Sequence, residues 1–397
     1  MQVEEAAALV WELARDEEVD RLLLDLLRAP SPQTAQMEMD PAIREFVSDV
    51  IAPRIESISG ARTEFDGMGN LLVRMGDSME SDGLLFMAYA MTFPPATMVD
   101  PYSGAVVSGA PFQIDGPCVW GRGACEQKGP LAAMIGAVGI LARLGRPLMK
   151  PFVLVVSLAG ETGRHDAARY ILEHGSLQAG YGVVGLGTDN RVCLGHKGRL
   201  DVEIMVRGVS THSSTPWVGI NAIEGVRRVM DCLDGLRLEA NHASLGKATL
   251  TPTRIESGPL ISHTIQDRCR LTLDRRLLPG EDPDGAFKKI ESVLLDLAPW
   301  KIDVARGDIM YPSEVSENCP VAVSLMAACD RLLAEGVPPC YLPAALDAGF
   351  LNRSGMETVM FGPGDLRFAH SNQEIVSLKS VRDAARIYAA TALQLLA

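Results

Sequence analysis

The chain has 397 residues, enough for two or three domains of ordinary size or for one large domain that carries an insertion. Its 47% apolar and 22% charged residues are typical of a folded globular protein and exclude disordered, collagen-like and coiled-coil classes. The formal net charge of −13 repels phosphate backbones and anionic lipid surfaces. We therefore expect neither a nucleic acid nor a membrane as partner.

The first residues and the cysteines indicate the cellular compartment of the protein. The opening stretch, MQVEEAAALVWELARDEEVD, is acidic where a signal peptide needs a basic region and then an apolar run. No apolar stretch reaches the ~18 residues that a membrane span requires. The eight cysteines are scattered without a CxxC pair, so they indicate small core residues rather than a disulfide framework. These features predict a cytoplasmic protein.

The N-terminal segment predicts one amphipathic helix, with Leu13, Val19, Leu22 and Leu26 on one face, that ends near Pro30. Apolar runs typical of buried strands follow it, and helical patterns separate them. The strands are expected at 83–89, 152–158, 181–186 and 358–362, and two of the helices at 130–144 and 166–174. This alternation predicts the α/β class, with a mainly parallel sheet that is covered on both faces.

The pattern changes after Gly198. Apolar and charged residues alternate in 199–208, 269–274 and 301–305, and helical patterns lie between these stretches at about 219–236 and 283–298. A half-exposed sheet with helices on one side fits this period of two. We therefore expect an inserted α+β domain over 199–310. The α/β domain then comprises 1–198 and 311–397 and ends with a helix over 377–396.

Polar residues with metal-binding side chains follow several of the predicted strands. Ligands of an open parallel sheet lie beyond the carboxyl ends of its strands, where Glu126, Glu161 and His370 are expected. Carboxylates and imidazole are usual ligands of zinc and manganese. Each residue also has a simpler interpretation: Glu126 as a surface carboxylate, Glu161 as an acid stabilised by a helix dipole, and His370 as a loop histidine.

Five motifs occur in a characteristic order: GRGACEQKGP (121–130), GHKGRLDVEIMVRGVSTHSSTPWVGINAIE (195–224), LTLDRRLLPGE (271–281), LDAGFL (346–351) and FGPGDLRFAHSNQE (361–374). With them the chain resembles the aminoacylase, carboxypeptidase G and succinyl-diaminopimelate desuccinylase family of metallopeptidases over nearly its whole length. The resemblance implies a catalytic α/β domain that holds two zinc ions. It also implies that a smaller inserted domain forms a homodimer.

The family's ligands for one of the two ions are missing. Its His-x-Asp motif aligns with Tyr89-Ala90-Met91, and the acid of its Glu-Pro-Thr motif aligns with Leu186. The other ion is held in the family by positions that here are Glu126, Glu161 and His370. Since three protein ligands and a water are an adequate zinc set, the resemblance favours one retained ion, zinc or manganese, over none.

The family's general base, the first of two paired glutamates, aligns with Gly160. A carboxylate in this role is commonly worth ~10²–10⁴ in rate. Glu126 is our first candidate for a replacement if no metal ion claims it, and His165 is the second, with Tyr89 and Cys125 behind them. The simpler interpretation of His165 is an exposed histidine on a helix. Cys125 as a nucleophile would need an activating base and a depressed pKa, so a buried thiol is the simpler interpretation.

The resemblance also implies substrate-binding residues. Arg276 aligns with an arginine that binds the substrate carboxylate. The planar guanidinium group suits this task because it can donate two parallel hydrogen bonds to a carboxylate. His212 aligns with a histidine that reaches across the dimer to stabilise the tetrahedral oxyanion. His263 stands where the family has an asparagine, and Gly362 is expected to allow close approach of the backbone to a ligand.

The predicted function is hydrolysis of an amide or related C–N bond in a small carboxylate-bearing compound, with at most one metal ion. Two alternatives stay open. One is a non-catalytic homologue that binds a ligand or regulates an active relative, and the other is a metal-independent amide- or acyl-transfer enzyme. Retention of Glu161, His212, Arg276 and His370 favours the hydrolase, because a purely structural role needs no polar site on both domains.

Overall fold

The computed structural model describes residues 1–76, 82–160, 162–174, 179–333 and 336–397. The chain folds into two compact units, of which the first comprises Met1–Gly195, Glu314–Tyr341 and Phe350–Ala397, and the second His196–Ser313 and Leu342–Gly349. The sequence places the corresponding boundaries after 198 and after 310. The return of Leu342–Gly349 to the second unit has no counterpart in the sequence prediction, because this short segment shows no periodic pattern.

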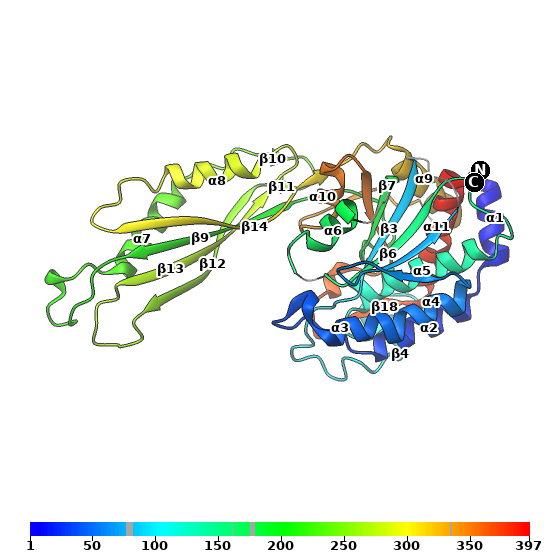
Figure 1. The fold of residues 1–397 in the computed structure, drawn as a ribbon, viewed down its shortest axis with the longest axis horizontal. Helices are drawn as coiled ribbons and strands as arrows, with labels where there is room; N and C mark the ends of the chain where they lie inside the picture. Colours follow the sequence, from blue (N-terminus) through cyan, green and yellow to red (C-terminus); the bar gives the residue numbers. More distant parts are fainter. Residues whose placement is uncertain (77–81, 161, 175–178, 334–335) are drawn as a thin grey trace. The chain divides into compact units, whose positions relative to one another are not determined.

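The first unit is built on a mixed sheet (Figure 1). Its strands follow the order β1 (Thr63–Phe65), β2 (Leu71–Met75), β6 (Phe152–Ser157), β3 (Gly83–Tyr89), β7 (Ala179–Gly185), β17 (Glu357–Phe361), β8 (Cys193–His196) and β15 (Ser313–Glu314), and β16 (Cys340–Leu342) pairs with β8. The central strands β6, β3, β7 and β17 are parallel, whereas β2 and β8 join them antiparallel. The predicted α/β class and the four predicted buried strands are confirmed. The sheet has antiparallel strands on both sides of its parallel centre, which the prediction of a mainly parallel sheet did not include.

Helices α5 (Gly129–Ala142) and α11 (Leu378–Leu396) pack against each other, and α5 also contacts β3, β6 and β7. The other helices of this unit are α1 (Val3–Leu13), α2 (Asp16–Arg28), α3 (Pro41–Glu45), α4 (Ala52–Ser59), α6 (Asp166–His174), α9 (Pro320–Leu332) and α10 (Ala348–Arg353), of which α10 begins in the second unit. Figure 1 shows the two chain ends together, where the Met1 amino group donates to the Ala397 carbonyl at 3.1 Å. Among the described residues, no helix is long and apolar enough to cross a bilayer.

The prediction of a single N-terminal helix is wrong. Ala14 and Arg15 have extended backbones and separate α1 from α2. The acidic run that begins at Asp16 explains the break, because three consecutive acids are stabilised in the first turn of a helix and not in its middle. Leu13 therefore belongs to α1, while the apolar face from Val19 to Leu27 belongs to α2.

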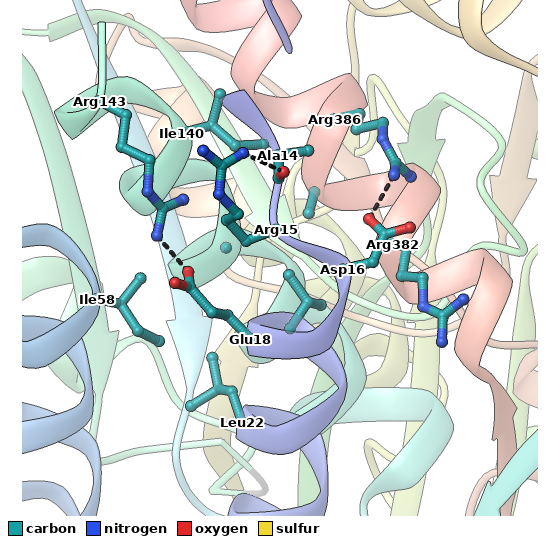
Figure 2. A pocket seen from close by; sticks show the side chains of 13 residues that line it. Ala14, Arg15, Asp16, Glu18, Leu22, Ile58, Ile140, Arg143, Arg382 and Arg386 are labelled. Atoms are coloured by element: carbon teal, nitrogen blue, oxygen red, sulfur yellow. Dashed lines mark hydrogen bonds and ion pairs between the residues drawn. The ribbon is translucent and has the colours of Figure 1, made fainter. Parts of the chain in front are cut away.

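A small cavity lies where the junction of α1 and α2 meets α5 and α11 (Figure 2). Three arginine–carboxylate pairs join α2 to these two helices: Arg143 with Glu18, Arg382 with Asp20, and Arg386 with Asp16. The cavity has room for about a single water molecule. It is therefore a feature of helix packing and not a ligand site.

The second unit contains a four-stranded antiparallel sheet in the order β12 (Thr249–Gly258), β13 (Arg268–Leu277), β9 (Gly198–Arg207) and β14 (Lys301–Met310). Helices α7 (Ala222–Asp234) and α8 (Pro283–Ser292) cover one face, where alternate residues of β9 and β13 form the core (Figure 1). The α+β character predicted for this region is confirmed. Strand β12 was not predicted, because it is an edge strand with mostly exposed residues and a proline at position 252.

Candidate functional site

Glu126 lies on a short π-helix, η4 (Ala124–Lys128), that follows strand β5 (Pro117–Trp120) and leads directly into α5. The turn before it depends on Gly123, whose φ of 83° favours glycine and whose missing Cβ would lie 2.4 Å from Thr92 Cγ2. Single π-turns inside helices are frequent at functional sites. The GRGACEQKGP motif thus forms a tight turn that presents Glu126 at the start of a buried helix.

Glu126 and His370 meet although 244 positions separate their numbers (370 − 126). Glu126 Oε2 lies 2.8 Å from His370 Nε2, and the exposed fractions of the two side chains are 15% and 41%. The His370 ring stacks on Phe93, with 4.0 Å between the ring centroids. His370 also has a φ of 58°, a costly conformation that persists in non-glycine residues only where the surroundings enforce it. Two good metal donors therefore converge on one partly exposed point.

Behind this pair lies a fully buried ion pair between Arg122 and Glu374. Arg122 Nη1 donates to Glu374 Oε2 at 2.8 Å, and the backbone N–H groups of Gly123 and Cys125 donate to the same carboxylate at 3.0 and 3.2 Å. Burial raises the pKa of Glu374, whereas these hydrogen bonds and Arg122 oppose the rise. The carboxylate thus clamps the turn that carries Glu126.

Arg122 also connects this clamp to the histidine. Its Nη2 donates to the Pro95 carbonyl at 3.1 Å, and its guanidinium lies 5.6 Å from the centroid of the Phe93 ring, which supports His370. Sequence reasoning did not single out Arg122 or Glu374. Both lie inside motifs quoted above, but no local pattern pairs two residues whose numbers differ by 252.

Lys128, at the end of η4, is a second buried cation that the sequence did not reveal. Its Nζ donates to the Ala29 carbonyl at 2.6 Å and lies 4.9 Å from the centroid of the Phe46 ring. Burial lowers the pKa of Lys128 to about 7, although Glu374 acts in the opposite direction. The lysine therefore ties η4 to the segment that follows α2.

The positions that align with the family's other metal ligands are buried. Tyr89 and Leu186 are buried at the ends of β3 and β7, and the Leu186 N–H donates to the Phe361 carbonyl at 3.2 Å. A Cβ at Gly160 would lie 2.7 Å from the Met91 carbonyl oxygen, so the backbone itself occupies the space that the family's base would need. The donor set does not fit the two-ion centre that the family resemblance implies.

Of the candidate bases, Cys125 is held as a thiol. It is fully buried, and its pKa is raised well above the usual value by burial and by the charges of Glu374 and Glu126. His165 is buried beside Phe350, with 5.3 Å between the ring centroids, so the expectation of an exposed helix histidine is wrong. It lies just before the first residue of α6.

Glu161, the third expected ligand, lies outside the described residues. In the part of the chain that the structure describes, histidine, cysteine, aspartate and glutamate side chains form no group of three suited to a metal ion. Glu126 and His370 supply two donors at one point. They fit one ion if a further ligand comes from Glu161, because a catalytic zinc site uses three protein ligands.

Three expected substrate-binding residues belong to the second unit. The rings of His212 and His263 lie 5.8 Å apart, and His212 Nδ1 pairs with Ser214 Oγ at 2.7 Å. Arg276, on the exposed face of β13, binds Asp274 through Nε and Nη2 at 2.8 and 3.0 Å. Two nitrogens of the Arg276 guanidinium thus already bind the Asp274 carboxylate on the same strand.

Gly362, in the first unit, lies close to another segment of the protein backbone rather than to a ligand. A Cβ there would lie 2.5 Å from the Leu186 carbonyl oxygen, and the Gly362 carbonyl accepts hydrogen bonds from the N–H groups of Thr188 and Asn190. The glycine therefore allows two turns of the fold to pack together. Its role toward a ligand stays a prediction.

Comparisons with known proteins agree with the motifs. The family described as "Peptidase dimerisation domain" matches residues 194–301. The chain is 27% identical to the uncharacterized protein YgeY of Escherichia coli over 98% of both chains, and 28% identical to the acetylornithine deacetylase of Myxococcus xanthus over 66% of this chain and 69% of that protein. An M20 family metallo-carboxypeptidase from Sulfolobus solfataricus has the same fold, with a TM-score of 0.77 and 18% identity over 96% of this chain and 99% of that one. The matched domain and these relatives support the M20, or aminoacylase-type, family of metallopeptidases, which the motifs of this chain resemble.

Proposed function

We propose that this protein hydrolyses an amide or related C–N bond in a small carboxylate-bearing compound, with one divalent ion held by Glu126, Glu161 and His370. The relatives support a hydrolase of the M20 family, and one of them is named for an N-acetylated amino acid. The observation that carries the proposal is the convergence of Glu126 Oε2 and His370 Nε2 at 2.8 Å on a partly exposed point of an otherwise buried region.

An ion at this point would act as a Lewis acid that polarises the scissile carbonyl and acidifies a water molecule. Side chains of the protein would supply the positioning and the proton transfer. Phe93 and the Arg122–Glu374 pair hold the imidazole and the carboxylate in place, so little reorganisation is needed when a substrate binds. Because Glu126 is an ion ligand in this proposal, His165 is the candidate to accept the proton of the attacking water. Glu126 would take that role only in a site without an ion.

The second unit supplies the proposed recognition residues. Arg276 would bind the substrate carboxylate while Asp274 holds its guanidinium in a fixed plane, and His212 would stabilise the oxyanion across a homodimer. His263, near His212, would line the same pocket. The match of residues 194–301 to a peptidase dimerisation domain supports the homodimer.

One observation favours a second candidate function. Gly160 and Leu186 replace acidic residues of the parent mechanism, and the space at Gly160 is filled by the Met91 carbonyl. A homologue that binds a carboxylate ligand without hydrolysing it needs neither acid. A metal-independent amide-transfer enzyme would also tolerate these losses.

The test is release of free amine from a panel of N-acetyl amino acids, N-carbamoyl amino acids and dipeptides, with added zinc or manganese and with a chelator. We expect metal-dependent turnover that falls ~10²–10⁴-fold in His165→Ala. Glu126→Gln should lose bound metal together with turnover, because a neutral amide is a poorer ligand than a carboxylate. His174→Ala is the matched control, because His174 lies at the opposite end of α6 from His165 and should leave turnover unchanged. Saturable binding without turnover of any compound would support the binding homologue, and turnover that survives the chelator would support metal-independent chemistry.

A further inference from the structure

Two cysteines that the proposed chemistry does not use lie on neighbouring strands. Cys193 begins β8 and Cys340 begins β16, and these strands pair with each other. The Cys340 N–H donates to the Val192 carbonyl at 2.9 Å, which places Cys340 beside the first residue of β8. Both residues are thiols in this structure.

The spacing of these strands suits a disulfide. Paired strands lie about 4.7–4.9 Å apart, and the Cα atoms of a disulfide-bonded pair usually lie about 4.4–6.8 Å apart. Residues that stand beside each other on paired strands have their side chains on the same face, so the Cys193 and Cys340 side chains leave the strands on the same side. The cysteines can therefore approach each other without a change in the backbone pairing.

The two sulfurs differ in the way that a thiol–disulfide exchange requires. Cys340 is partly exposed, and the hydrogen bond from Cys193 lowers the pKa of its thiol, although burial opposes this. Cys193 is fully buried. By contrast, burial raises the pKa of the thiols at Cys118, Cys125, Cys269, Cys319 and Cys329. Cys340 is thus suited to react first with a reagent from solution, and Cys193 to resolve the product.

We propose that Cys193 and Cys340 are a reversible redox pair that low-molecular-weight disulfides such as oxidised glutathione convert to an intramolecular disulfide. The Cys340 thiolate attacks one sulfur of the reagent, forms a mixed disulfide and releases one thiol. Cys193 then loses its proton and attacks Cys340 Sγ, which releases the second thiol. Two protein thiols are oxidised, the reagent is reduced to two thiols, and the protons of the cysteines pass to them.

Both cysteines belong to the first unit, each near the end of one of its segments. The first unit ends at Gly195, two residues after Cys193, and again at Tyr341, one residue after Cys340. A disulfide would therefore join two segments of the first unit that are far apart in the sequence. This inference does not depend on the proposed hydrolase function.

The experiment uses the full-length reduced protein, which is equilibrated with mixtures of reduced and oxidised glutathione, treated with an alkylating agent and mapped by peptide mass spectrometry without reduction. We expect a 193–340 disulfide that reduced glutathione reverses. Cys193→Ser should stop at a glutathione adduct on Cys340, and Cys340→Ser should leave Cys193 reduced. Cys232→Ser is the matched control, because Cys232 is partly exposed on α7, and it should still form the disulfide.

The wild-type result alone can overturn the inference, so it does not depend on the folding of a variant. A stable glutathione adduct on Cys340 of the wild-type protein would show that Cys193 does not resolve it. Alkylation of both cysteines at every ratio of glutathione would show that the pair does not react. Either outcome contradicts the proposed redox pair.

Discussion

Gly160 is packed too closely against the end of β3 to carry a side chain. The family's general base belongs at this position, yet the Met91 carbonyl oxygen lies 2.7 Å from where a Cβ would be, and Tyr89 Cβ lies at 3.3 Å. A side chain here would have to displace the backbone at the end of β3. If the family alignment holds at Gly160, a single substitution there would not restore the base, because the side chain has no room.

We expect Gly160→Ala to lower the free energy of unfolding by about 1–3 kcal/mol, the usual cost of overpacking a well-packed region. Gly285→Ala in α8 is the matched control, because its Cβ would meet nothing closer than 3.4 Å. It should be neutral or stabilising, since alanine is the better helix former. Urea unfolding of both variants gives the comparison, and equal stabilities would show that the space at Gly160 is open.

Arg276 gives a second prediction at this scale. Arg276→Ala should weaken binding of an N-acetyl amino acid by roughly 10–100-fold, because a charge-assisted hydrogen bond contributes about 1.5–3 kcal/mol. Binding of the corresponding carboxamide should change little. Arg254→Ala removes a similar ion pair, with Glu256, from the exposed edge strand β12 and should alter neither affinity. Equal losses for acid and amide, measured by calorimetry, would assign Arg276 a structural role.

At the scale of elements, the junction of η4 and α5 joins the site to the core. Helix α5 is buried on nearly all sides, and η4 at its start carries Glu126 outward while Lys128 points into the protein. A buried ammonium is costly unless it finds partners, and here those are the Ala29 carbonyl and the Phe46 ring. The lysine thus makes the stability of this junction depend on pH.

The sign of that dependence follows from the lowered pKa. Between pH 7 and about 10.4 the unfolded chain keeps the proton of Lys128 while the folded chain loses it, so stability gains with rising pH. In Lys128→Met this contribution is absent. The stability of the wild type relative to the variant should therefore rise across this window, by at most about 1.4 kcal/mol per pH unit.

Urea unfolding at several pH values between 7 and 10 measures this difference. Lys301→Met, at an exposed position of β14, is the matched control and should run parallel to the wild type. A constant difference between the wild type and Lys128→Met across the window would mean that the buried lysine keeps its proton in the folded state.

At the scale of the whole molecule, the sequence predicted those strands whose apolar residues follow a regular local pattern. The buried strands β3, β6, β7 and β17 have continuous apolar runs, and β9 and β13 alternate cleanly, so their existence and class were visible. The break between α1 and α2 depends on the charge of a few residues and was missed. The edge strand β12 lacks an apolar face and was missed for that reason.

The site was predictable only in part. Family motifs named Glu126 and His370, which the fold brings to 2.8 Å. The buried partners Arg122 and Glu374 were missed, because their role depends on the pairing of β5 with β18 (Ile375–Ser377), which a single sequence does not reveal. The closure of the space at Gly160 is likewise a property of the packed sheet edge and not of the residue alone.

The most direct test of the proposed single-ion site is the metal content per chain, measured by elemental analysis after loading with zinc or manganese and desalting. We expect about one ion per chain for the wild type and a loss of most of it in His370→Ala, with His174→Ala unchanged. No bound ion after loading, or two ions per chain, would contradict the site built from Glu126, Glu161 and His370.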